Sequence, residues 1–149
     1  GFELPALAAS TYARLSEVVP PVGSILRNPL DISGVGWSLS NVMGCLEAIA
    51  TDPAVDMIIV HHRIYRSHSM LAQEDFASMN SSLATFRQRI GKPLVLVSNS
   101  GVLSTDVQRQ AVELELVGAG VPVFPTFERA AWAVGRVSHY WRHIHGLRA

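Results

Sequence analysis

Residues 91–98 read GKPLVLVS, and this stretch decides which class of fold the sequence specifies. The apolar residues 94–97 follow a Gly-Lys-Pro stop and precede a serine. A continuous apolar run of this length is typical of a β-strand that is covered on both faces, as the strands of parallel sheets are. The run MIIV at residues 57–60 has the same character. The two runs therefore predict two buried strands of a mainly parallel sheet.

Three weaker runs complete the predicted set of strands. Residues 2–4 form the weakest run, and residues 29–32 are bounded by a proline and a glycine. Residues 121–124 follow a Gly-Ala-Gly stop and include Pro122. Proline donates no hydrogen bond to a neighbouring strand, so this last run is expected at an edge of the sheet.

Apolar residues at helical spacing separate these runs. They lie within residues 42–49, 76–90 and 107–117. Thr126 is placed to cap a final helix that runs through Trp132 towards Tyr140. Helices and strands that alternate at these lengths predict a three-layer α/β domain with a mainly parallel sheet.

Length and composition fit one globular domain that spans residues 1–149, with 48% hydrophobic and 16% charged residues. Twelve basic residues balance twelve acidic ones, so the formal net charge is zero. Neither nucleic acid nor a membrane surface is an expected partner, because both call for a clustered excess of basic residues. The longest apolar runs are too short to span a bilayer.

Two further features bear on the cellular setting. Cys45 is the one cysteine and lies in a helical pattern, which favours a buried, inert thiol over a reactive one. A cytoplasmic location is therefore expected. The chain begins with Gly1 rather than methionine, which indicates a processed or excised piece of a larger protein.

In open α/β sheets, ligands bind at the carboxyl ends of the strands, and three loops are candidates there. The first loop, residues 33–40, reads SGVGWSLS. Its glycines allow a close backbone approach, and Ser38 or Ser40 can cap a helix and touch an anion. The spacing matches neither GxGxxG nor a Walker loop, so a plain turn is the favoured alternative on pattern alone.

The second and third loops carry other polar candidates. Residues 61–70 read HHRIYRSHSM, whose histidines suit proton transfer and whose arginines suit carboxylate or phosphate. Metal binding is disfavoured because the loop has no Cys, Asp or Glu, and a polar surface loop is the more common explanation. Residues 98–104 read SNSGVLS, which offers small hydrogen-bonding side chains, although Ser104 or Thr105 can simply cap the next helix.

These loops supply all the candidate site residues. No catalytic residue and no metal ligand is assigned, and the candidates for cofactor binding are Ser33, Gly34, Gly36, Ser38, His61, His62, Arg63, Asn99 and Ser100.

The final helix carries two possible features of interest. His139 and His143 share a helical face, but zinc needs further ligands that are not evident, so a solvated helix end is expected. Trp132 and Trp141 indicate that this helix packs on something, either its own sheet or a neighbouring domain.

Taken in order, several segments resemble one family. They are GFELPAL (1–7), PPVGSILRNPLDISG (20–34), LEAIATDPAVDMIIV (46–60), GKPLVLVSNSG (91–101) and GAGVPVFPTFERAAWAV (118–134). Together they resemble the flavodoxin-like ligase domain of NDP-forming acyl-CoA synthetases, in the succinyl-CoA synthetase superfamily. The most specific signs are N-P-L-D followed by D-P-A-V-D before an apolar strand. The resemblance covers essentially the whole chain.

The resemblance implies a module of a larger enzyme. Such enzymes make an acyl-CoA from an acid, CoA and a nucleoside triphosphate through an acyl phosphate and a phosphohistidine. CoA, ATP or ADP, and magnesium are implied for the full enzyme, with none bound tightly by this chain. The implied partners are the CoA-binding, phosphohistidine and ATP-grasp domains. None of these has a counterpart in the sequence, and His61, His62 and His68 do not match the phosphohistidine motif.

The resemblance also implies a gap. Family members begin this domain with a strand and a helix upstream of the position that matches Gly1. The absent strand would lie between residues 30–32 and 57–60 in the sheet. We therefore expect a strand from another chain or a second copy to fill the gap, or the strands to pair around it.

The resemblance places DISGVGW (31–37) at the edge of the implied active site. There a contact with a ligand or a partner domain is as much to be expected as a plain bend. Asp31 is expected to make capping or interface hydrogen bonds. The alternative to a ligase domain is a non-catalytic module that binds CoA or a nucleotide for regulation or assembly.

Overall fold

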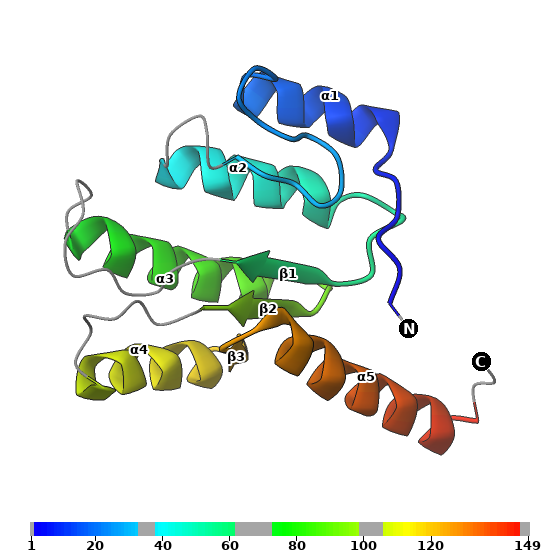
Figure 1. The fold of residues 1–149 in the computed structure, drawn as a ribbon, viewed down its shortest axis with the longest axis vertical. Helices are drawn as coiled ribbons and strands as arrows, with labels where there is room; N and C mark the ends of the chain where they lie inside the picture. The colour runs from blue at the N-terminus through cyan, green and yellow to red at the C-terminus, as the bar shows by residue number, and fades with distance from the viewer. Residues whose placement is uncertain (1, 33–37, 62–72, 99–105, 147–149) are drawn as a thin grey trace.

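The computed structural model describes residues 2–32, 38–61, 73–98 and 106–146 (Figure 1). The chain alternates helices with short strands, as the sequence predicts. In order, the elements are α1 (Ala9–Val18), α2 (Leu39–Ala50), β1 (Ile58–His61), α3 (Gln73–Arg89), β2 (Leu94–Val97), α4 (Asp106–Gly118), β3 (Val123–Phe124) and α5 (Phe127–Ile144).

The described strands form one parallel sheet in the order β1-β2-β3. Strand β1 pairs with β2 from Ile58 opposite Leu94 to His61 opposite Val97, and Val97 lies opposite Phe124 of β3. The α/β class and the parallel sheet are therefore confirmed. The apolar run at residues 94–97 forms β2 and is buried along its whole length, as expected of a central strand.

Two of the predicted strands do not exist. Residues 2–4 form no strand, and residues 29–32 contribute only an isolated antiparallel bridge between Asp31 and Ile25. The Ile25 N–H donates to the Asp31 carbonyl at 2.7 Å, and the Asp31 N–H donates back at 2.9 Å. These hydrogen bonds close a short turn around Asn28, so the bridging backbone groups are satisfied locally and do not join the sheet.

Helices lie on both faces of the sheet (Figure 1). On one face, α2, α3 and α4 enclose the main core against β1 and β2. On the opposite face, Val95 and Val97 pack against the fully buried Ala130 of α5. The members of the main core are Val42, Leu46, Val55, Ile58, Met79, Leu83, Phe86, Leu94, Leu96, Leu116 and Val121.

Helix α1 is not predicted by the sequence, because it lacks a local start signal. Its N-cap residue is Ala8, which has no side-chain oxygen to accept a hydrogen bond from the first turn. The helix packs on α2 rather than on the sheet, and Leu15 is buried there with Cys45 and Ala48 (Figure 1). Burial raises the pKa of the Cys45 thiol, as expected of an inert cysteine.

Asp52 supplies the missing cap. Its carboxylate accepts hydrogen bonds from the Ala8 N–H at 2.8 Å and from the Ala54 N–H at 2.9 Å, and the residue is fully buried. The Lys92 ammonium group donates to the Asp52 backbone carbonyl at 2.5 Å. One residue therefore connects the start of α1, the end of α2 and the turn before β2. Hydrogen bonds from the Thr11 side chain, then from Ala8 and Ala54, lower the pKa of Asp52.

Replacing Asp52 with alanine is expected to lower the free energy of unfolding by about 3 kcal/mol, because it leaves two backbone N–H groups without their charged acceptor. Urea denaturation followed by far-UV circular dichroism measures the change. The matched control is D56N, which alters the exposed acidic residue of the same D-P-A-V-D motif and should shift the free energy by less than about 0.5 kcal/mol. Equal effects of the two variants would contradict the role given to Asp52.

Stability is also expected to depend on pH through Asp52. Because the folded state lowers the pKa of this carboxyl, its contribution is complete above its unfolded pKa of about 3.9 and is lost as pH falls through the folded pKa. The difference in unfolding free energy between the wild type and D52N should therefore be constant near neutral pH and shrink below about pH 4. A difference that grows on acidification would refute the assignment.

Candidate functional site

The candidate site is the edge of the sheet at which its strands end. Because β1 and β2 are parallel and in register, their last residues, His61 and Val97, lie at the same edge. Helices α2, α3 and α4 all begin on this side of the sheet (Figure 1). Such an edge gathers loops and helix N-termini, which is where α/β proteins bind ligands.

Ser38 starts helix α2 at this edge. Its hydroxyl oxygen accepts a hydrogen bond from the Asn41 N–H at 3.1 Å, which confirms the predicted capping role. The Ser38 and Ser40 hydroxyl oxygens are 3.1 Å apart, so the two side chains share a hydrogen bond. A serine cap of this kind keeps its hydroxyl proton free to donate either to the second serine or to an oxygen of a ligand.

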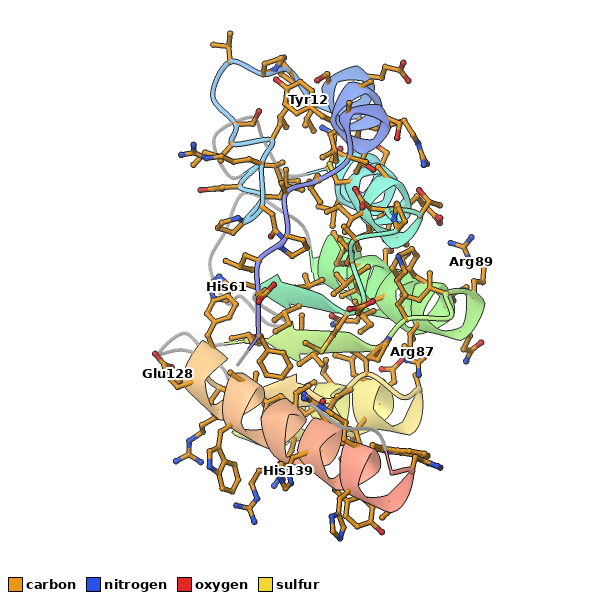
Figure 2. All side chains as sticks on the ribbon, turned by 90° about the vertical axis from the view of Figure 1, so that its right-hand side faces the viewer. Tyr12, His61, Arg87, Arg89, Glu128 and His139 are labelled. Carbon is orange, nitrogen blue, oxygen red and sulfur yellow. The ribbon has the colours of Figure 1, made fainter. Side chains whose placement is uncertain are left out.

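His61 ends strand β1 and is exposed. Its ring lies 5.4 Å from the ring of Phe127, centroid to centroid, with the two planes tilted by 47°. Figure 2 shows the imidazole above the first turn of α5, the turn that carries Glu128. The contact holds His61 beside the start of this helix, where the imidazole can donate or accept a hydrogen bond.

The N-terminus of α5 already holds an anionic group of the chain itself. The Thr126 hydroxyl oxygen accepts from the Arg129 N–H at 3.3 Å, so the predicted cap of the final helix is confirmed. Hydrogen bonds from its own N–H, then from Thr126, lower the pKa of the Glu128 carboxyl. A carboxylate in this position complements the helix dipole and competes with a phosphate for the same N–H groups.

The remaining candidates lie outside the described residues. These are Ser33, Gly34 and Gly36 of the first loop, His62 and Arg63 of the second, and Asn99 and Ser100 of the third. Of the described ends of these loops, His61 ends β1 and the buried Ser98 follows β2, so both adjoin the same edge. Helix α2, which Ser38 caps, begins on the same side of the sheet (Figure 1). The Ser98 N–H donates to the Phe124 carbonyl at 2.9 Å, which ties the third loop to the end of β3.

The histidines at the end of α5 and just beyond it lie on a solvated helix end, as the sequence predicts. His139, His143 and His145 are all exposed, and His145 stacks on Trp141 with the ring centroids 4.6 Å apart. Within the described ranges, no group of three or more His, Cys, Asp or Glu residues is arranged to hold a metal ion. Helix α5 packs on its own sheet, one of the two expected partners, through Ala130 and Val134. Trp132 and Trp141 are exposed, so the tryptophans that suggested this packing do not make it.

Two important residues escape the sequence patterns. In the sequence, Asp52 is recognisable only as part of the Asp-Pro pair that ends a helix. Its role as a cap of α1 depends on Ala8, which is 44 residues away. Glu128 is absent from the predicted site residues, although Thr126 followed by an acidic residue in the first turn is a recognisable helix-start signal.

Two further findings complete the description of the chain. None of the helices in the described part is both long enough and apolar enough to cross a membrane. Compared with known proteins, the chain matches no family model, and no curated protein is significantly similar to it.

Replacing Thr126 with alanine is expected to cost about 1 kcal/mol of unfolding free energy, because the Arg129 N–H loses its acceptor. Thermal or urea denaturation measures the loss. The matched control is T85A in the interior of α3, where the Thr85 hydroxyl only bonds back to the Ser81 carbonyl and alanine is the better helix former. A loss as large for T85A as for T126A would show that the cap has no special role.

Proposed function

We propose that this chain is the flavodoxin-like ligase domain of an NDP-forming acyl-CoA synthetase. The whole enzyme converts an acid, CoA and a nucleoside triphosphate into an acyl-CoA, a nucleoside diphosphate and phosphate. The domain shapes the nucleotide and phosphohistidine side of a composite active site and supplies no catalytic residue. Its partners are the CoA-binding, phosphohistidine and ATP-grasp domains of the same enzyme.

One observation supports this proposal above the others: the resembling segments bind one another. The Asn28 amide of N-P-L-D donates to the Pro5 carbonyl of the first segment at 3.2 Å. Lys92 of the GKP segment donates to the Asp52 carbonyl of D-P-A-V-D. The residues on which the resemblance rests are thus residues that join distant parts of the chain, which is what a shared fold requires of its signature positions.

The residues at the carboxyl edge are compatible with the proposed role. Ser38 and His61 can each donate to a phosphate oxygen, whereas the Glu128 carboxylate makes the start of α5 unsuitable for one. CoA, ATP or ADP, and magnesium would be held chiefly by the other domains. When they are bound there, the nucleotide supplies the phosphoryl group and CoA supplies the thiol.

The proposal includes a partner strand along β1. The Ile58 N–H donates to the Pro93 carbonyl, so it faces β2. Because successive N–H groups of a strand face opposite sides, those of Ile59 and His61 face the outer edge of β1. No described strand pairs with that edge. A strand from another domain or a second copy would satisfy these groups.

Amide hydrogen exchange tests this strand. In the isolated chain, the amides of Ile59 and His61 are expected to exchange at least about tenfold faster than that of Val60, which faces β2 and serves as the internal control. In the natural full-length protein, all three should be protected. Equal protection of the three amides in the isolated chain would rule out a requirement for an outside strand.

The function itself is tested on the natural polypeptide. Its intact mass is expected to be several times the 16.2 kDa of this chain, and it should form acyl-CoA and ADP only when acid, CoA and ATP are all present. Deleting residues 1–149 should abolish turnover, whereas D56N should leave it unchanged. If the natural polypeptide instead has the mass of this chain and binds CoA or ADP in calorimetry without turnover, a regulatory or assembly module replaces the ligase domain.

A further inference from the structure

Helix α5 carries an apolar stripe that the described part of the chain buries only around Ala130 and Val134, while Phe127 at its start is 50% exposed. The stripe has the alternating spacing of three and four residues that is typical of helix-to-helix packing, and it consists of Phe127, Ala130, Val134, Val137, Trp141 and Ile144. Ala130 is fully buried against β2, and Val134 is partly buried there. Beyond that point α5 runs past the sheet (Figure 1).

The second half of the stripe therefore meets no part of the described chain that buries it. Val137, Trp141 and Ile144 are 56%, 54% and 48% exposed. Large apolar side chains at helical spacing, left half exposed on one face, mark a contact surface. The helix is also basic: Phe127–Ile144 contains three arginines and one glutamate, so its net charge is +2 with histidine neutral.

Helix α4 presents a complementary stripe. Leu114 is 70% exposed and Val117 is 53% exposed, and their spacing of three residues places them on neighbouring positions of the helix surface, away from the buried Leu116. The small residues Ala111 and Gly118 adjoin Leu114 on this side and leave room for a bulky neighbour. The helix contains one arginine and three acidic residues, so its net charge is −2. Glu115 is exposed beside the stripe.

We propose that α4 of one copy of this chain packs along the C-terminal half of α5 of a second copy. The two stripes match in character, and the two helices have equal and opposite charge. A single chain cannot join the stripes, because α4 packs on one face of the sheet and α5 on the other. Trp141 would lie against Leu114, with Arg142 and Glu115 on the flanks.

This contact is heterologous, since it joins two different surfaces. It therefore leaves one α4 and one α5 free in every pair and allows larger assemblies. Each stripe offers only two or three large side chains, far less than the roughly 800 Å² per partner of a standard stable interface. The association is accordingly weak and should be detectable only at high protein concentration.

Sedimentation velocity on the 149-residue chain tests the contact. The average mass is expected to rise from 16.2 kDa with concentration, and W141S should raise the dissociation constant at least about tenfold. The matched control is W132S. Trp132 is also exposed on α5 but lies outside the stripe, next to Arg136, whose guanidinium is 5.2 Å from its ring. Circular dichroism confirms that each variant is folded.

Charge reversal identifies the two surfaces. E115R and R142E should each weaken self-association at least about tenfold, and an equimolar mixture of the two variants should regain it, because the introduced arginine of one variant then meets the introduced glutamate of the other. A wild type that stays monomeric at all concentrations would overturn the proposal. The proposal would also be overturned if R142E or W141S weakened self-association and E115R did not. That result would assign the contact to two α5 helices. Self-association is measured without acyl-CoA synthesis, so this proposal and the proposed function can each be refuted without the other.

Discussion

The rest of the structure depends on the buried carboxylate of Asp52. A fully buried charge is costly unless its oxygens are hydrogen-bonded, and here both oxygens accept backbone N–H groups. One of those N–H groups belongs to Ala8, at the start of a helix that has no cap of its own. The carboxylate therefore does what a local serine or aspartate does in most helices, and it also complements the dipole of α1.

This interaction determines the position of the layers. Helix α1 is held on α2 rather than on the sheet, and the turn that contains Asp52 delivers the chain into β1. Lys92 holds the start of β2 to the same turn, so β1 and β2 enter the sheet together and leave it together at His61 and Val97. The alignment of the candidate site at the carboxyl edge thus follows from contacts at the opposite edge.

Two surfaces of the described residues have no packing or pairing partner within the described part of the chain. The outer side of β1 faces no strand, and the second half of the α5 stripe faces no core. The outer edge of β1 presents backbone groups that a neighbouring strand would pair, and α5 presents regularly spaced apolar side chains that a neighbouring helix would bury. The two proposals each place a partner on one of these surfaces.

The sequence by itself determined the local features of this protein. Continuous apolar runs marked β1 and β2, and helical spacing marked α2 to α4. Thr126 marked the start of α5, and Ser38 was one of two candidate caps of α2, because a capping side chain and its partner lie three residues apart. Tertiary structure decided everything that joins distant residues. It made α1 a helix through Asp52, turned residues 29–32 into a local bridge with Ile25, and left Trp141 exposed because α5 outruns the sheet. The reason is that the spacing of apolar and polar residues indicates which side chains are stabilised by burial or by a hydrogen bond. Only the folded chain determines whether a partner lies close enough to provide it.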